Sequence, residues 1–478
     1  MNRRVPLARY PGMNRFVLDW LGGDERFLRR GTHRETAPDV RRQPHDRGSL
    51  AAALEESNRR WGISTDASLG PWARGESLTI IAGQQVGFAG GPLYTLAKLA
   101  TLVRLKRDLE SQGIPVTAFF WLATEDHDFD EVASLNLPVS TLSSTTEVNR
   151  ELDLHCIRAI RKADPRAAVG SLPVADSLSS QLISFYDIER PSWLREGISF
   201  RDSFAELIAS MFGNDVVLVD SLLPELRRAG EPLFQRIHAC RNEIQTALSA
   251  RASELQAAGY REQVVPGDGD EYTLLFEIDE NGIRRPFVGS ATPPERISTS
   301  ALTRPLLQDF VIQPDIFVGG PAEVAYYAQI APLHDLLSVA MPRVALRGHA
   351  LIAPSRVIRT MERYSIDVPD IFDSPDAILA AREAEGVSTV RRIAEEAKGD
   401  LIRRIGEIGE LALPADHSLA RSFQRSVGHI EYHFDALARR AANGLVRKDR
   451  ERFAATRRAV AMLYPDRHVQ DRVVGWYP

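Results

Sequence analysis

The stretch from Thr79 to Glu131 reads TIIAGQQVGFAGGPLYTLAKLATLVRLKRDLESQGIPVTAFFWLATEDHDFDE. It contains, in order, an apolar run, a glycine-rich turn, a long helical pattern, a second apolar run and a dense acidic cluster. This order predicts strand, loop, helix and strand in an α/β fold with a parallel sheet. Ligands of such open sheets bind outside the carboxyl ends of the strands. We therefore expect the turn at residues 83–92 and the acidic cluster at residues 125–131 to line one crevice.

The composition is that of an ordinary globular protein and argues against nucleic-acid and membrane partners. The 478 residues predict two or three structural units. With 59 basic and 64 acidic side chains the net charge is -5, which argues against nucleic acid as a partner. The two cysteines fit a reducing compartment, and neither a signal-peptide pattern nor an apolar run of membrane-spanning length is visible. The prediction is a cytoplasmic protein without a membrane partner.

Two insertions and a helical segment accompany the predicted sheet. Short β-like pieces, including VSTLSSTTEV, follow the acidic cluster. A long helix from Leu223 to about Gly259 precedes further strands, two of which are joined by the hairpin turn Glu280, Asn281 and Gly282. We predict residues 1–134, 200–222 and 301–376 as the core, 135–199 and 223–300 as insertions, 377–464 as a helical domain, and 465–478 as a shortened tail.

The helical domain carries apolar side chains at steps of three and four residues. The pattern runs from Val390 to Leu411 and again from Leu419 to Leu445, with Pro414 between the two runs. It predicts two long amphipathic helices in an antiparallel coiled-coil hairpin. Arginine and glutamate dominate the outer positions, which argues against a membrane helix. We therefore expect the hairpin to pack on another copy of the chain, giving a homodimer, or on its own core.

The turn AGQQVGFAGGP follows the first predicted strand and opens a helix at Pro92. Free N–H groups and the positive end of the helix dipole suit an anion at such a position, most simply a nucleotide phosphate. The turn matches neither GxGxxG nor GxxxxGK(S/T), so neither of those nucleotide-binding classes is indicated. Tight packing of the turn explains the glycines equally well.

The cluster TEDHDFDE is the second candidate site. Its acidic side chains fit a Mg²⁺ site, a general base, or carboxylates that bind a substrate ammonium group. The alternative is a solvated acidic loop that caps the following helix. Its position favours a functional site, because the cluster directly follows the apolar run VTAFFWLA, and a buried strand directs the residues at its end into the crevice.

Four segments together resemble a known family. GQQVGFAGGPLYTLAK, FFWLATEDHDFDE, TRPLLQDF and FVGGPAEVAYYAQI are similar, in this order and at these separations, to the BshC family, the cysteine ligases of bacillithiol biosynthesis. LARYPGMNRFVLDWL, VVLVD and LYPDRHVQDR are similar to it too, so the resemblance covers nearly the whole chain. It implies a Rossmann-like parallel-sheet core with two connecting insertions, a helical coiled-coil domain and a dimeric assembly.

The resemblance also implies an activity. BshC proteins are expected to join the carboxyl group of L-cysteine to the amine of glucosaminyl malate, in the last step of bacillithiol biosynthesis. A carboxylate is a poor electrophile, so ATP is implied as the activating cofactor, with Mg²⁺ as a further one. A metal-dependent hydrolase built on the acidic cluster and a non-catalytic dimeric scaffold are the alternatives.

Individual residues receive roles from this resemblance. Catalysis, or binding of the substrate amine or of Mg²⁺, is assigned to Glu125, Asp126, His127 and Asp128. Arg304 is the first choice for the malate carboxylates, since its guanidinium can bind a carboxylate through two hydrogen bonds. The remaining binding residues for nucleotide, cysteine or substrate are Gly83, Gln84, Gln85, Gly90, Gly91, Tyr94, Lys98, Gln308, Asp309, Gly319, Gly320, Glu323, Tyr326 and Gln329.

Overall fold

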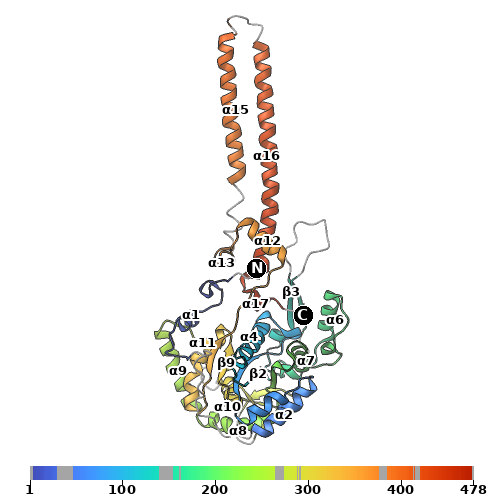
Figure 1. The fold of residues 1–478 in the computed structure, drawn as a ribbon, viewed down its shortest axis with the longest axis vertical. Helices are drawn as coiled ribbons and strands as arrows, with labels where there is room; N and C mark the ends of the chain where they lie inside the picture. The colour runs from blue at the N-terminus through green and yellow to red at the C-terminus, as the bar shows by residue number, and fades with distance from the viewer. Residues whose placement is uncertain are drawn as a thin grey trace. The chain divides into compact units, whose positions relative to one another are not determined.

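The computed structural model describes residues 4–29, 47–138, 154–160, 163–263, 274–287, 289, 292–375, 385–412, 414 and 420–475. The chain forms two compact units. The core unit comprises residues 6–139, 154–351 and 468–478, and the helical unit comprises residues 1–5, 140–153 and 352–467. Figure 1 shows the helices and strands of both units.

A five-stranded parallel sheet lies at the centre of the core unit and confirms the predicted fold class. Its strands follow the order β10-β9-β1-β2-β5, so β1 pairs with β2 on one side and with β9 on the other. The strand order reverses between β1 and β9, and such a switch point is where open α/β sheets bind ligands. The strands are β1 (Leu78–Gln84), β2 (Val116–Leu122), β5 (Val217–Asp220), β9 (Ile316–Gly319) and β10 (Arg343–Leu346).

Both faces of this sheet are covered, which explains the nearly continuous apolar runs in its strands. Successive side chains of a strand point to opposite faces. In β2, Phe120 and Leu122 therefore join one apolar cluster, and Phe119 and Trp121 join the other. The first cluster includes α4 (Leu93–Glu110) and α7 (Phe200–Phe212), and the second includes α8 (Pro224–Ala239), α10 (Arg304–Ile312) and α11 (Pro321–Leu336).

The first insertion follows the acidic cluster. It begins with the short helix α5 (Phe129–Val132) and an antiparallel hairpin of β3 (Ser134–Pro138) and β4 (Leu154–Arg158). Helix α6 (Asp176–Tyr186) follows before the chain continues into α7. The predicted β-like segment VSTLSSTTEV falls on residues 139–148, which lie outside the described residues.

The second insertion contains two helices where the sequence predicts one. α8 ends at Ala239 and α9 (Arg241–Ala257) begins after Cys240, whose backbone angles of φ -100 and ψ 23 are not those of a helix. The predicted hairpin turn is confirmed, and Gly282 adopts a positive φ of 76 there. The following sheet has the order β7-β6-β8, with β6 (Leu275–Ile278), β7 (Arg284–Pro286) and β8 (Ile297–Thr299).

The helical unit contains two long helices that lie side by side in opposite directions, in agreement with the predicted hairpin (Figure 1). Lys398 of the first donates a hydrogen bond to Asp435 of the second at 3.1 Å. Residues 352–375 group with this unit, whereas the sequence analysis placed them in the core. The helices are α12 (Ser355–Tyr364), α13 (Val368–Asp373), α15 (Glu385–Ala412) and α16 (Ala420–Leu463), followed by η9 (Pro465–Arg467).

The C-terminal segment, residues 468–475, belongs to the core unit. It contains the short helix α17 (Gln470–Val473), after which Val474 bridges to Asn136 and Gly475 bridges to Pro92. In the described part of the chain, no helix is both long and apolar enough to cross a membrane. The remaining elements are η1 (Leu7–Arg9), α1 (Arg15–Leu21), α2 (Arg47–Arg60), α3 (Asp66–Ala73), η2 (Phe88–Gly90), η3 (Val169–Ser171), η4 (Ser192–Leu194), η5 (Gly213–Asp215) and η7 (Pro294–Arg296).

Candidate active site

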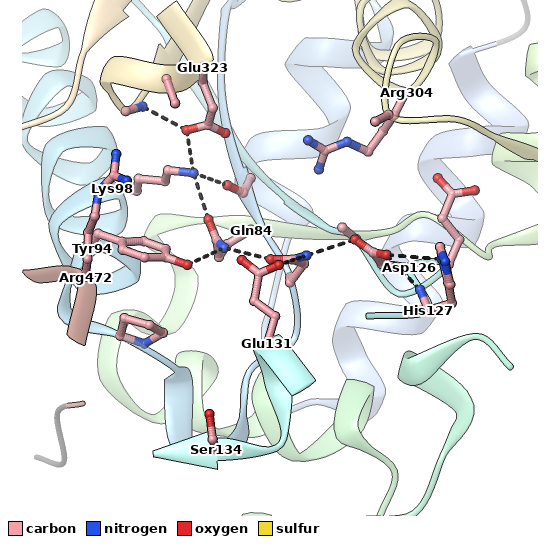
Figure 2. Close-up of a pocket in the computed structure, with 18 of the residues that line it drawn as sticks. Gln84, Tyr94, Lys98, Asp126, His127, Glu131, Ser134, Arg304, Glu323 and Arg472 are labelled. Carbon is pink, nitrogen blue, oxygen red and sulfur yellow. Dashed lines mark hydrogen bonds and ion pairs between the residues drawn. The ribbon is translucent and has the colours of Figure 1, made fainter. Parts of the chain in front are cut away.

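A cavity of about 740 Å³ opens in the core unit at the carboxyl ends of β1 and β2 (Figure 2). Its volume lies in the upper part of the range of ligand-binding pockets, roughly 300–1,000 Å³. The glycine-rich turn and the acidic cluster both line it, which confirms that they share one crevice. We call it the main cavity.

The main cavity brings together eleven of the predicted site residues, which come from β1, α4, the acidic cluster, α10 and the start of α11. Asp128 lies instead in a shallower second cavity of about 500 Å³. The predicted residues that line the main cavity are Gly83, Gln84, Gln85, Tyr94, Lys98, Glu125, Asp126, His127, Arg304, Gly320 and Glu323. Those outside its lining are Gly90, Gly91, Gln308, Asp309, Gly319, Tyr326 and Gln329.

Packing accounts for the glycines of the turn. Gly83 pairs with Trp121 across β1 and β2, and a Cβ atom at residue 83 would lie only 2.9 Å from the Cβ of Trp121. Gly90 and Gly91 have φ values of 84 and 70, a region that side-chain-bearing residues rarely adopt. The N–H of Leu93, in the first turn of α4, donates to the Val474 carbonyl at 2.9 Å. The C-terminal segment thus takes up one of the N–H groups at the helix start that the sequence offers to an anion.

Lys98 is buried and uses all the hydrogen bonds that an ammonium group can donate. Its Nζ donates to the Gly83 carbonyl and to Gln84 Oε1, both at 2.8 Å, and lies 2.6 Å from Glu323 Oε2. An ammonium group has three N–H donors. Lys98 therefore ties β1 to the start of α11 across the switch point, and this arrangement leaves it no donor for a phosphate or a carboxylate of a ligand.

Glu323 is the acidic partner in this link. Burial favours the neutral acid, but the charge of Lys98 and a hydrogen bond from the Gly320 N–H, at 2.8 Å, hold the pKa of Glu323 below its usual value. A side chain at the third helical position that accepts from the residue before the helix is half of a capping box. Glu323 is thus an ionised residue that fixes the first turn of α11.

A chain of polar side chains crosses the main cavity from Lys98 to the acidic cluster (Figure 2). Gln84 Nε2 lies 3.2 Å from the Tyr94 hydroxyl and 3.3 Å from Gln85 Oε1, to which it donates. Gln85 Nε2 in turn donates to Asp126 Oδ2 at 2.9 Å and to Glu131 Oε2 at 2.7 Å. These contacts join the two segments that the sequence predicts to face each other.

Asp126 and Glu131 have different electrostatic surroundings. Burial raises the pKa of Asp126, but hydrogen bonds from Gln85 and from the N–H groups of Asp128 and His127 more than offset this, so its pKa lies below the usual value. Desolvation raises the pKa of Glu131, and the charges of Asp128 and Asp126 add to the increase. Asp126 is therefore an ionised carboxylate near neutral pH, and Glu131 is the better proton acceptor. The sequence analysis left Glu131 out of the candidate residues.

Asp128 matches the alternative explanation of the acidic cluster, a loop that caps the following helix. Its carboxylate accepts a hydrogen bond from the Glu131 N–H at 3.2 Å and caps α5. His127 lies beside Asp126, and its Nδ1 is 3.0 Å from the Arg284 guanidinium. Arginine can only donate, so this contact requires an unprotonated Nδ1 on His127. His127 would then carry its ring proton on Nε2.

Glu125 is buried and surrounded by donors. Its carboxylate accepts from Arg227 at 2.6 Å, from the Ser298 hydroxyl at 2.6 Å, and from the hydroxyl and N–H of Thr299 at 3.0 and 3.2 Å. Burial raises its pKa, but the charges of Arg227 and Arg284 outweigh this and lower it. This environment suits a residue that fixes β8 of the second insertion to the end of β2, and it does not suit a proton acceptor for a substrate.

The remaining predicted side chains on α10 and α11 form hydrogen bonds within the protein. The Asp309 carboxylate accepts from Gln308 and Tyr327 at 3.1 and 3.2 Å and lies 2.9 Å from His334 Nε2. Tyr326 donates to the Ala301 carbonyl. Gln329 Oε1 accepts from the N–H of Gln263 at 3.3 Å. Their contacts lie in the packing between elements, outside the lining of the main cavity.

Two arginines in the main cavity are without a hydrogen-bond or ion-pair partner for their guanidinium groups among the described residues. Arg304 is the first residue of α10, and Arg472 lies in α17. Figure 2 shows both at the edge of the polar chain that contains Gln84. The sequence analysis chose Arg304 but missed Arg472, for which the resemblance of LYPDRHVQDR was the only signal.

Comparison with known proteins agrees with this geometry. The family model described as "Bacillithiol biosynthesis BshC, N-terminal Rossmann-like domain" matches residues 25–288 and 287–348. The chain belongs to the BshC family. Relatives include a Koribacter versatilis protein, 31% identical, with 98% of this chain and 93% of the relative covered, and a Salinibacter ruber protein, 26% identical, with 96% and 88% covered. Both carry the name "Putative cysteine ligase BshC".

The BshC model match spans the turn, the acidic cluster, α10 and the start of α11, and it ends before the C-terminal segment. Arg472 therefore enters the cavity from outside the matched domain. Within the described residues, no three His, Cys, Asp or Glu side chains are arranged to hold a metal ion.

Proposed function

We propose that this BshC protein joins the carboxyl group of L-cysteine to the amine of glucosaminyl malate in bacillithiol biosynthesis. One observation carries the proposal. The main cavity of this BshC chain has carboxylates on one side, and it also has two arginines whose guanidinium groups lack a protein partner among the described residues. The acceptor substrate has an amine and two carboxylates, so it needs both kinds of group. Asp126 and Glu131 suit the amine, and Arg304 suits the malate carboxylates.

Amide formation requires the amine to lose a proton before it attacks. A proton acceptor works best when its pKa is close to the operating pH, and the raised pKa of Glu131 brings it nearer to that condition than Asp126. Asp126 then binds the ammonium form and positions it. Gln85 contacts both carboxylates and holds them on the same side of the cavity.

The carboxyl group of cysteine also needs activation. ATP, as part of this proposal, would supply it by converting a carboxylate oxygen into a leaving group. Lys98 is fully hydrogen-bonded, and Arg304 is assigned to malate. Among the cationic side chains described in the cavity lining, Arg472 therefore has free donors for phosphate oxygens. A cytoplasmic location and a homodimer through α15 and α16 complete the proposal. The dimer is supported by apolar side chains that are more than half exposed there, namely Ile393, Ile408, Leu411, Tyr432 and Leu437.

The test is product formation by the purified chain. The protein is incubated with L-cysteine and glucosaminyl malate, with and without ATP, and bacillithiol is measured by mass spectrometry. Asp126→Asn removes a charge from the cavity, and Asp66→Asn, in the first turn of α3 and outside the cavity lining, is the matched control. We expect product from the wild type and the control and at least a tenfold lower rate from Asp126→Asn, since charge-assisted hydrogen bonds contribute about 1.5–3 kcal/mol.

Absence of product from the wild-type chain under every condition would overturn the proposed activity. An unchanged rate for Asp126→Asn would leave the activity in place and remove the acidic cluster from it. Product formed without ATP would overturn the cofactor assignment alone.

A further inference from the structure

Arg472 is distinguished from most other cations of the main cavity by the groups that surround it. Lys98 is paired with Glu323, Arg347 lies 2.8 Å from Asp471, and Arg284 donates to the Thr299 carbonyl at 2.7 Å. Only Arg304 and Arg472, among the cationic side chains that the structure describes in this lining, have guanidinium groups without such a partner. Their charges are therefore available to a ligand.

The segment that carries Arg472 is fixed on both sides. Asp471, which is 2% exposed, forms the buried ion pair with Arg347. Asn136 of β3 donates from its side chain to the Val473 carbonyl at 3.1 Å, and its carbonyl accepts from the N–H of Gly475 at 2.8 Å. These contacts do not involve the Arg472 side chain. Its position is thus set by its neighbours, while its guanidinium stays free.

The same segment occupies one of the N–H groups that the start of α4 would offer to an anion. The Val474 carbonyl accepts the N–H of Leu93, and Gly475 bridges to Pro92, directly before α4. A ligand oxyanion cannot use that N–H group while the carbonyl occupies it. Arg472 supplies a positive charge on the same side of the cavity, beside Tyr94, whose ring hydroxyl belongs to the polar chain.

Arg304 and Arg472 occupy different parts of the cavity. Arg304 begins α10, whereas Arg472 belongs to α17 of the C-terminal segment. In Figure 2, Arg304 and Arg472 lie on opposite sides of Gln84 and Glu131. An amide ligase handles an anionic acyl donor as well as the acceptor, so two separate cationic positions match two anionic ligands. This step rests on the proposed function.

We propose that Arg472 is a second oxyanion-binding residue of the site and binds a carboxylate or phosphate group on the acyl-donor side, separate from the malate carboxylates at Arg304. The carboxylate would come from cysteine and the phosphate from ATP. The C-terminal segment therefore contributes a ligand-binding residue to the site of the Rossmann-like domain.

Isothermal titration of the full chain tests this with three probes: ATP, L-cysteine and glucosaminyl malate. Arg472→Gln should weaken ATP or cysteine by about tenfold, the equivalent of 1.4 kcal/mol, and leave glucosaminyl malate within twofold. Arg304→Gln should show the opposite preference. Arg241→Gln, at an exposed arginine in the first turn of α9, lowers the net charge equally and should change none of the three affinities.

Several outcomes would overturn the inference. They are equal affinities of the wild type and Arg472→Gln for ATP and cysteine, a loss confined to glucosaminyl malate, or the same loss in Arg241→Gln. Since the Arg472 guanidinium has no protein partner among the described residues, the variant should keep the unfolding temperature of the wild type, and this control separates lost binding from lost fold. If the wild type binds none of the three probes, the proposed function fails. The anion site at Arg472 is then tested separately with inorganic phosphate as the probe. A tenfold weaker phosphate affinity of Arg472→Gln than of the wild type supports the site, and an equal affinity or no phosphate binding overturns it.

Discussion

Replacing Arg227 by methionine should lower the free energy of unfolding of the core unit by about 3 kcal/mol. Arg227 is 0% exposed, and its guanidinium donates to Glu125 and to the Ser221 carbonyl, both at 2.6 Å, and to the Ile297 carbonyl. Methionine retains an apolar stem but removes these donors. Breaking a buried ion pair by removing one partner costs about 3–5 kcal/mol, because the other charge stays buried. Arg284 and the Ser298 hydroxyl still stabilise Glu125, which favours the lower value.

A double variant separates the pair from its surroundings. Glu125→Gln alone leaves the Arg227 charge buried and should cost a similar amount. In Arg227→Met combined with Glu125→Gln neither charge remains, so the combined loss should be smaller than the sum of the single losses by about 2 kcal/mol, within the range of coupling energies for contacting residues. The coupling measures how strongly the second insertion is tied to the end of β2.

Urea unfolding followed by tryptophan fluorescence is the assay. The tryptophans that the structure describes, Trp20, Trp61, Trp72, Trp121 and Trp193, all lie in the core unit, so the signal reports on that unit. The control is Arg228→Met, one residue further along α8, where the side chain is half exposed and pairs with Glu225 and Glu295. Exposed pairs contribute about 0–1 kcal/mol. A loss below 1 kcal/mol for Arg227→Met, or additive losses in the double variant, would refute the reasoning.

Two further predictions concern pH. Burial raises the pKa of Asp471, but His349 and Arg347 more than offset this, so its folded pKa lies below the unfolded value of about 3.9. The pair therefore stabilises the fold above that value and loses its effect as the pH falls through the folded pKa. The unfolding temperature of Asp471→Asn should be lower than that of the wild type at pH 7 and should converge with it in acid, and a constant difference would contradict this. Desolvation raises the pKa of Glu131, so protonation of Glu131 should weaken glucosaminyl malate binding as the pH falls. In Glu131→Gln this loss of affinity should therefore occur at lower pH than in the wild type. Identical curves of affinity against pH for the two proteins would contradict a role of Glu131 in binding the amine.

The sequence by itself determined the order of elements and the edge of the sheet where the site lies. Apolar runs bounded by turn residues predict buried strands, and the topology of parallel sheets places the residues after each strand at one edge. Gln85 and Asp126 could therefore be expected to face one crevice. The hairpin at Gly282 and the long pair of helices are predicted by equally local patterns.

Tertiary structure decided which of the candidate side chains are free. Lys98 and Glu125 look like ligands in the sequence, but the first is saturated by Gly83, Gln84 and Glu323, and the second is held by partners from the second insertion. Whether a charged side chain can bind a ligand depends on the donors and acceptors that surround it, and these come from segments distant in the chain. Arg472 is the converse case: a residue with no local signal is brought to the cavity because Asp471 pairs with Arg347 and Val474 caps α4.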